Sequence, residues 1–170
     1  MNPKTDIELP DAEKLLAALT AQMREQLGPE TGLIGIRTGG VWLAERLHRD
    51  LALKVPCGAL DVSFYRDDFR NKGLKHQVKP SVIPFDVEGR DLVLVDDVLY
   101  TGRTIRAAMN ELFDYGRPAS IRLAALVDRG RRELPIAAQF VGATIALPPG
   151  QNVELLREAG GNLSLKLYAD

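Results

Sequence analysis

The sequence predicts an α/β fold with a mainly parallel central sheet that is flanked by helices on both faces. Two observations support this prediction. Short apolar runs typical of buried strands alternate along the chain with segments of helical periodicity. Such alternation implies crossover connections between parallel strands. The 170 residues, 45% hydrophobic and 26% charged, can build one core. We therefore expect residues 1–170 to form a single domain.

The first half of the chain predicts two helices and two strands. Asp11 is a favourable N-cap, and apolar residues then recur at helical spacing over 12–27, until a Gly-Pro pair ends the helix. The apolar run at 33–36 predicts a strand, and a second helical pattern covers 41–51. Residues 59–65 alternate between apolar and polar side chains, which predicts another strand.

The second half begins with a long charged segment, 66–80, that has no usable periodicity and is predicted to be a loop. A continuous apolar run at 92–95 is typical of a strand buried on both faces. Helical periodicity follows over 104–115, ended by Gly and Pro. Further apolar runs at 121–127 and 140–145 predict two more strands.

The composition excludes several classes of protein. The net charge of −1 argues against a strongly basic nucleic-acid footprint, although a local basic patch stays compatible with it. A single cysteine, Cys57, cannot form an intramolecular disulfide and fits a reducing compartment. No apolar run approaches the length of a membrane span, and the first ten residues lack the apolar core of a signal peptide. We therefore expect a cytoplasmic protein that does not enter a membrane.

The most informative segment is VLVDDVLYTGRT at 93–104. In a parallel sheet, ligands bind beyond the carboxyl ends of the strands, and here such an end delivers Asp96 and Asp97. A turn with Thr101, Gly102 and Thr104 then opens a helix, whose N-terminus favours a phosphate. Glycine allows close backbone approach, the hydroxyls add donors, and the carboxylates suit vicinal hydroxyls. Together these features describe a pocket for a ribose 5-phosphate.

Other interpretations of this segment fit it less well. An acidic strand end or a Thr-Gly turn, considered separately, is typical of a solvated loop with a helix cap. The complete run in this order, after a strand predicted to be buried, favours the ribose 5-phosphate pocket. A P-loop is excluded because no Gly-Lys-Ser/Thr follows a glycine-rich turn, and a dinucleotide fingerprint is also missing. Two more segments, 37–40 and 128–132, follow predicted strands and are therefore expected at the same edge of the sheet.

Residues 93–104 resemble the phosphoribosyl pyrophosphate (PRPP) signature of type I phosphoribosyltransferases. Other segments narrow the resemblance to the pyrimidine operon regulator/uracil phosphoribosyltransferase family, over roughly residues 10–145. These segments are GIRTGG (35–40), DVSFYRDD (61–68), IPFD (83–86), VDRG (127–130) and RELPI (132–136). The resemblance implies the type I phosphoribosyltransferase fold, with a flexible loop at about 66–80 and a small hood formed by the N-terminal and C-terminal segments.

The resemblance also implies roles for individual residues. The 5-phosphate would lie at residues 101–104, the ribose hydroxyls at the two acids, and pyrophosphate at a loop after the first strand. The implied PRPP contacts are Arg37, Thr38, Gly39, Asp96, Asp97, Val98, Leu99, Tyr100, Thr101, Gly102, Arg103 and Thr104. The implied catalytic residues are Asp96, Asp97 and Arg66, and those at the base are Val127, Asp128, Arg129 and Val153. Mg²⁺ would bind through substrate and water, without a direct protein ligand.

One position departs from the family pattern. The family often has an arginine directly after the threonine of the pyrophosphate loop, where this chain has Gly39. The change removes one cation from the leaving-group site, and Arg37 is the neighbouring cation that could compensate. By itself, a Thr-Gly-Gly sequence is equally typical of an ordinary strand-to-helix turn.

Three functions are compatible with these features. The first is an enzyme that converts uracil and PRPP to UMP and pyrophosphate, and the near-neutral charge favours it. The second is an RNA-binding regulator of pyrimidine genes that responds to UMP or UTP. It would bind an mRNA leader through a basic face of a homo-oligomer, a dimer or tetramer, built from Arg129, Arg131, Arg132 and loop residues. The third is a phosphoribosyltransferase for another base, a purine or orotate.

Overall fold

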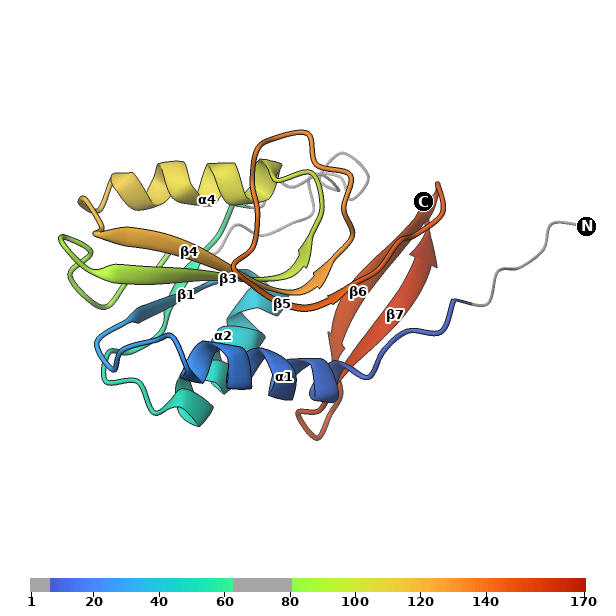
Figure 1. Ribbon diagram of the computed structural model, residues 1–170, viewed down its shortest axis with the longest axis horizontal. Helices are drawn as coiled ribbons and strands as arrows, with labels where there is room; N and C mark the ends of the chain where they lie inside the picture. The colour runs from blue at the N-terminus through green and yellow to red at the C-terminus, as the bar shows by residue number, and fades with distance from the viewer. Residues whose placement is uncertain (1–6, 63–80) are drawn as a thin grey trace, which may run out of the picture.

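A five-stranded parallel sheet forms the centre of the computed structural model, which describes residues 7–62 and 81–170 (Figure 1). All four ladders between neighbouring strands are parallel. In sheet order the strands are β2 (Gly58–Leu60), β1 (Gly32–Ile36), β3 (Asp91–Leu99), β4 (Ser120–Asp128) and β5 (Phe140–Thr144). The predicted α/β class with a mainly parallel sheet is confirmed.

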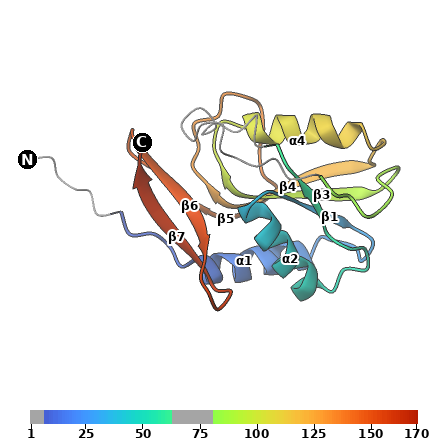
Figure 2. The same cartoon turned by 180° about the vertical axis from the view of Figure 1, so that it is seen from behind.

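Helices cover both faces of this sheet, as Figures 1 and 2 show from opposite sides. Helices α1 (Ala12–Arg24) and α2 (Gly39–Leu51) lie on one face, and α4 (Arg103–Phe113) lies on the other. The predicted N-cap is confirmed, because the Asp11 carboxylate accepts a hydrogen bond from the N–H of Lys14 at 2.9 Å. A helix beginning with such a cap has one fewer unsatisfied donor in its first turn.

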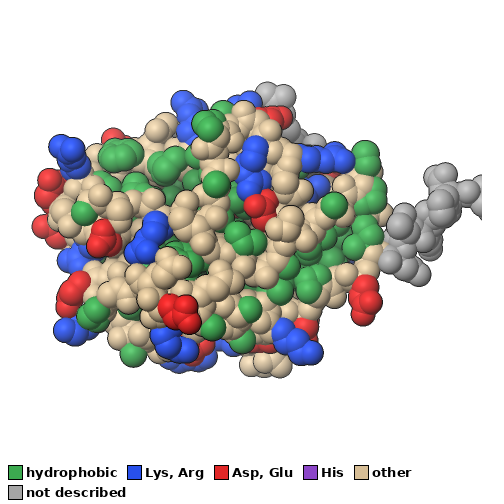
Figure 3. Space-filling view, viewed as in Figure 1, with side chains coloured by type: hydrophobic (Ala, Val, Ile, Leu, Met, Phe, Trp, Pro, Cys, Tyr) green, Lys and Arg blue, Asp and Glu red, His purple; other side chains and the backbone are tan. Residues whose placement is uncertain are grey.

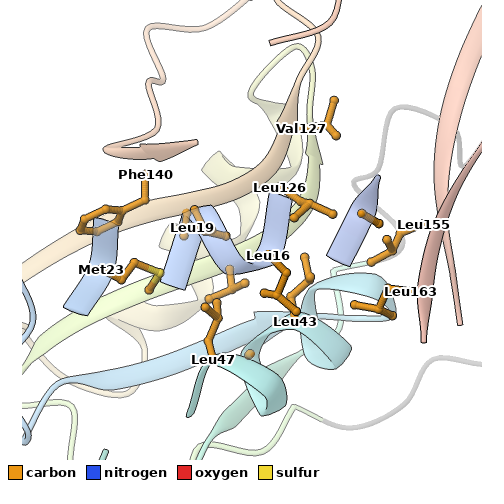
Figure 4. Packing of buried hydrophobic residues seen from close by; sticks show 14 of the residues in the cluster. Leu16, Leu19, Met23, Leu43, Leu47, Leu126, Val127, Phe140, Leu155 and Leu163 are labelled. Atoms are coloured by element: carbon orange, nitrogen blue, oxygen red, sulfur yellow. The ribbon is translucent and has the colours of Figure 1, made fainter. Parts of the chain in front are cut away.

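The hydrophobic core has two layers, one on each face of the sheet. Along β3, Val93 and Val95 pack toward α1 and α2, while Leu92 and Leu94 pack toward α4. Burial on both faces explains why the central strands are continuous apolar runs without alternation. Figure 4 shows the first layer, where Leu16, Leu19 and Met23 of α1 meet Leu43 and Leu47 of α2 and Phe140 of β5.

An antiparallel hairpin at the C-terminus was not predicted. It consists of β6 (Gln151–Arg157) and β7 (Leu163–Ala169), and its buried residues Val153, Leu155 and Leu163 join the core layer of α1 and α2. Its apolar residues alternate with polar ones, which is the pattern of a strand that is covered on one face only. The hairpin places the C-terminal segment beside the main sheet (Figure 1).

Two predicted strands have different limits in the structure. The strand expected over 92–95 runs from Asp91 to Leu99, so both acids of the central motif belong to a strand and not to a loop. Its last residues are held in register by β4, where Val98 pairs with Val127 and Leu99 with Asp128. The strand expected over 59–65 is observed as Gly58–Leu60, and residues 63–65 and the predicted loop 66–80 lie outside the described residues.

Glu13 connects α1 to both α2 and the hairpin. One carboxylate oxygen accepts hydrogen bonds from Arg46 Nη1 at 3.1 Å and from the N–H of Leu163 at 2.8 Å. The other oxygen accepts from Arg46 Nη2 at 2.7 Å. The hydrogen bonds from Arg46 and then from Leu163 lower the pKa of the Glu13 carboxyl, and they outweigh the effect of burial. The carboxylate form therefore stabilises the docking of the hairpin.

We expect Glu13→Gln to destabilise the fold at pH 7 and to weaken its acid dependence. A folded-state pKa below the ordinary value of 4.5 means that the stabilisation is complete above that pH. It is lost as the pH falls through the lowered pKa. Urea unfolding at pH 7 and pH 4 measures this, and Glu25→Gln, an exposed glutamate at the other end of α1, serves as the control. Equal acid dependence in the two variants would contradict the assignment.

Candidate active site

The parallel register brings three predicted segments to one edge of the sheet. Gly35 of β1 pairs with Val95 of β3, so the residues that follow β1 lie beside the two acids. On the other side, the N–H of Arg129, which follows β4, donates to the carbonyl oxygen of Leu99 at 2.9 Å. The segments 37–40, 96–104 and 128–132 are therefore neighbours at the carboxyl end of the sheet, where ligands of such folds bind (Figure 1).

The turn between β3 and α4 has the shape expected of an anion site. Gly102 has a φ of 94° and forms the N-cap of α4, and Thr101 Oγ1 accepts a hydrogen bond from the N–H of Arg103 at 3.2 Å. A Cβ on Gly102 would lie 2.9 Å from Ile136 Cγ1, so both the backbone angle and the space require glycine. The turn directs the N-terminus of an eleven-residue helix toward the strand ends.

The two acids differ in their access to a ligand. Asp96 is only 2% exposed, and its carboxylate accepts a hydrogen bond from the N–H of Asp97 at 2.9 Å. Asp97 is half-buried, and its own carboxylate accepts from the N–H of Val98 at 2.9 Å. Of the pair, Asp97 is the less buried residue.

Gly39 lies directly against Asp97. A Cβ at this position would lie 2.8 Å from Asp97 Cγ and would overlap a carboxylate oxygen. At the next residue, a Cβ on Gly40 would overlap the carbonyl oxygen of Val95. The N-terminus of α2 therefore packs on β3 without any side chain between them, just after the cis peptide bond that joins Arg37 and Thr38. The arginine frequent in the family does not fit here while Asp97 keeps this position.

The side chains at the carboxyl end of β4 are engaged with the protein itself. The Asp128 carboxylate accepts hydrogen bonds from Arg132 Nη2 at 2.6 Å and from the N–H of Gly130 at 2.9 Å. Burial alone would raise the pKa of the Asp128 carboxyl, but these hydrogen bonds and the charge of Arg132 hold it below its ordinary value. Val127 is fully buried. Among these residues, the backbone at the strand end is thus the group best suited to meet a base.

Arg129 connects the strand ends to the hairpin. Its guanidinium donates to Asn152 Oδ1 at 2.5 Å and to the carbonyl oxygen of Gln151 at 2.9 Å. It also lies over the ring of Tyr100, 4.0 Å from the ring centre. Val153, predicted to lie over a base, is buried in the core layer beneath the hairpin. Gln151 and Asn152 were missed because no motif marks them.

The side chain of Arg103 is paired with a glutamate from the segment that follows β4. Its Nε donates to Glu133 Oε2 at 2.6 Å, and both side chains are about half exposed. Arg66, predicted to be catalytic, lies outside the described residues, as does the rest of the loop 66–80. Within residues 7–62 and 81–170, no group of three or more His, Cys, Asp or Glu could hold a metal ion. In the same part of the chain, no helix is long and apolar enough to cross a membrane.

A separate cavity of about 450 Å³ lies between α2 and the turn of the hairpin. Its lining includes Trp42, Arg46, Arg49 and Arg157, but none of the residues predicted to bind PRPP or a base. Arg46 is paired with Glu13, and Arg157 lies over the Trp42 ring. We therefore place the candidate active site at the strand ends, where the chemically informative residues meet, and not at this cavity.

Comparison with known proteins agrees with this geometry. Residues 6–147 match the phosphoribosyl transferase domain family. The chain is 51% identical over 168 residues to the Bifunctional protein PyrR of Pseudomonas aeruginosa, covering 96% of this chain and 98% of that protein. The protein of the same name from Pseudomonas entomophila is 52% identical over 153 residues, covering 88% of this chain and 89% of the other.

Two solved structures are similar in fold alone. A hypoxanthine-guanine phosphoribosyltransferase of Bacillus anthracis has a TM-score of 0.66 at 21% identity, covering 87% of this chain and 86% of that chain. The enzyme from Leishmania tarentolae, solved with GMP, has a TM-score of 0.62 at 19% identity and covers 89% and 86%. The type I phosphoribosyltransferase fold implied by the sequence motifs is confirmed. The chain therefore belongs to the phosphoribosyltransferase family and, within it, to the PyrR proteins, the pyrimidine operon regulator/uracil phosphoribosyltransferase group.

Proposed function

We propose that the chain catalyses the formation of UMP and pyrophosphate from uracil and PRPP. The observation that carries the proposal is the meeting, at one sheet edge, of a half-buried aspartate, a glycine turn at a helix N-terminus and a Thr-Gly-Gly loop. These parts match the hydroxyls, the 5-phosphate and the pyrophosphate of one substrate. The base itself is assigned from the PyrR relatives, because their sequences match this chain over nearly its whole length.

The reaction makes one bond and breaks one at the anomeric carbon. The ring nitrogen of uracil forms the new bond, the carbon–oxygen bond to pyrophosphate breaks, and the nitrogen releases its proton. Because positive charge develops on the ribosyl group, the protein must orient both partners, stabilise the leaving anion and exclude water. In this proposal the Asp97 carboxylate accepts hydrogen bonds from the ribose hydroxyls. The Thr101–Gly102 turn holds the 5-phosphate. Thr38 and Gly39 face the pyrophosphate.

Members of this family generally use Mg²⁺ together with PRPP. Asp96 is buried and its carboxylate accepts a hydrogen bond from the backbone, and Asp97 is half-buried, so the ion would bind through PRPP and water and not through a cluster of protein ligands. Mg²⁺ retains several waters and binds through few carboxylates together with substrate phosphates. When bound with PRPP, the ion would neutralise charge that develops on the leaving pyrophosphate.

A regulatory role is the second candidate function, and it is favoured by the similarity to proteins named bifunctional. In this role the chain would bind a pyrimidine mRNA leader in response to UMP. Arg129 and Arg132, expected to contribute to the basic face, instead donate hydrogen bonds within the chain. Figure 3 shows acidic and basic side chains interspersed on one face of the molecule. An RNA surface would thus depend on Arg131, on other residues or on assembly of subunits.

The remaining proposals concern assembly and compartment. In Figure 3 hydrophobic side chains gather at the right of the molecule, over the region of the β6–β7 hairpin in Figure 1. Such a surface favours self-association, and we propose a dimer or tetramer. A reducing cytoplasm is the proposed compartment, since Cys57 is unpaired by disulfide. Sedimentation of the full chain tests the assembly directly.

With PRPP and Mg²⁺ present, we expect pyrophosphate release with uracil and little with hypoxanthine, guanine or orotate. The four bases differ in the groups along their edges, and a site that pairs with one edge rejects the others. The assay separates UMP by chromatography and measures pyrophosphate. Equal activity with a purine would overturn the proposed base, and inactivity with all four would overturn the proposed reaction. Binding of a labelled leader RNA with and without UMP tests the regulatory role.

Asp97→Asn should lower kcat while the protein stays folded. Loss of a hydrogen bond to a charged group costs about 1.5–3 kcal/mol, which corresponds to a reduction of about 10- to 100-fold. Asp91→Asn is the matched control, because Asp91 begins the same strand, at the opposite end of the sheet, and is exposed. Similar loss of activity in both variants would show that the effect comes from the strand and not from the site.

Gly39→Ala should raise the Michaelis constant for PRPP by about tenfold, a change of about 1.4 kcal/mol. The added methyl group would lie 2.8 Å from Asp97 Cγ and must displace that carboxylate or the N-terminus of α2. Gly28→Ala is the control, since a Cβ there meets nothing within 4 Å. An unchanged constant for Gly39→Ala would show that the close approach does not matter for PRPP.

A further inference from the structure

The side chain of Arg132 donates four hydrogen bonds beside the turn between β3 and α4. Its Nη1 donates to the carbonyl oxygens of Tyr100 at 2.7 Å and Gly130 at 3.3 Å. Its Nε donates to the carbonyl oxygen of Ile136 at 2.8 Å, and its Nη2 donates to Asp128 Oδ2 at 2.6 Å. A guanidinium has five N–H donors, and four of them are thus directed at protein oxygens.

The segment that carries Arg132 also holds the next two residues of the turn. The carbonyl oxygen of Thr101 accepts hydrogen bonds from the N–H groups of Glu133 at 2.9 Å and Leu134 at 3.2 Å. Gly102 lies against Ile136, whose Cγ1 is 2.9 Å from the position that a Cβ on the glycine would take. Residues 130–136 therefore hold three successive residues of the turn, through one side chain, two amides and one apolar contact.

The Asp128 carboxylate keeps this guanidinium in place. The Arg132 side chain is 22% exposed and that of Asp128 is 18% exposed. Their ion pair links the end of β4 to the segment that supports the turn. In such a partly buried pair the charge of Arg132 is balanced by a neighbour, and the planar fork is held in one orientation. An arginine with this set of partners is a poor ligand for a substrate phosphate, because binding it would require breaking those bonds.

We propose that Arg132 is a positioning residue: it fixes the turn of residues 100–102 in the shape that receives the phosphate, without contacting the ligand. The inference rests on the proposed function for the identity of the ligand, but its structural part is independent of it. Preorganising a binding loop strengthens binding because the entropy of ordering is lost before the ligand arrives. Arg132 therefore acts through Tyr100 and the turn.

The test compares Arg132→Lys with Arg90→Lys in the full chain. Lysine keeps the charge of Arg132 but not the fork that reaches three carbonyl oxygens and a carboxylate. Arg90 is a matched control, since it also donates to two carbonyl oxygens, those of Asp86 at 2.7 Å and Glu30 at 2.8 Å. It lies beside the start of β3, at the opposite end of the sheet from the turn. Both variants lose arginine-to-carbonyl hydrogen bonds of the same kind.

For Arg132→Lys we expect the Michaelis constant for PRPP to rise about tenfold, with a smaller change in kcat. Hydrogen–deuterium exchange of a peptide spanning residues 100–104 should become faster in this variant. For Arg90→Lys we expect a loss of thermal stability similar to that of Arg132→Lys. The Michaelis constant for PRPP and the exchange of residues 100–104 should not change in Arg90→Lys. Asp128→Asn provides a milder second variant, and exchange at the turn should be intermediate in it, even if Arg132→Lys folds poorly.

Two results would overturn the inference. Unchanged exchange at the turn in Arg132→Lys and Asp128→Asn would show that the segment does not fix it. A raised Michaelis constant with unchanged exchange would assign the guanidinium to direct contact with the ligand. If the unaltered protein does not use PRPP, the proposed function fails, and the exchange measurements still decide the structural role of Arg132.

Discussion

The parallel register of β1, β3 and β4 is the constraint on which the site depends. Because Gly35 pairs with Val95 and Leu99 with Asp128, three strands deliver their following segments to one edge. Hydrogen bonding alone does not complete the site, since α2 must also approach β3 without a side chain at residue 39. Backbone geometry thus brings the Asp97 carboxylate, the N-terminus of α4 and the Thr-Gly-Gly segment at 38–40 to one edge of the sheet.

The elements that were predictable are those whose sequence reports burial directly. These elements are the strands at 33–36 and 121–127 and the helix at 104–115. The strands are covered by helices and the helix packs on the sheet, so their buried positions require apolar residues that are visible in the sequence. The extension of β3 through both acids was not predicted, because aspartate is depleted in strands. Pairing with β4 keeps this part of β3 extended, and that pairing is not visible in the local sequence. The C-terminal hairpin was not predicted, because its apolar residues alternate with polar ones and form no continuous apolar run.

Local motifs in the sequence identified which residue types the site contains, but not which residues those side chains contact in the fold. The Thr-Gly turn and the adjacent acids were visible within one segment, and glycine at 102 is required by a φ of 94°. The contact between Arg132 and Tyr100 joins residues 32 positions apart, and that between Arg129 and Asn152 joins residues 23 apart. No local pattern encodes such distances, so both arginines could only be read as free cations from the sequence.

The internal use of these arginines bears on how one chain could combine catalysis with regulation. Arg129 lies over the Tyr100 ring and donates a hydrogen bond to the hairpin. Arg132 donates to the carbonyl oxygen of Tyr100. Both arginines therefore connect surrounding segments to the turn between β3 and α4. A nucleotide that orders this turn would therefore also affect the hairpin, through contacts already present. Arg129 is thus one contact within the described residues that connects the turn to the hairpin, and the hairpin lies in the region of the apolar surface (Figure 3).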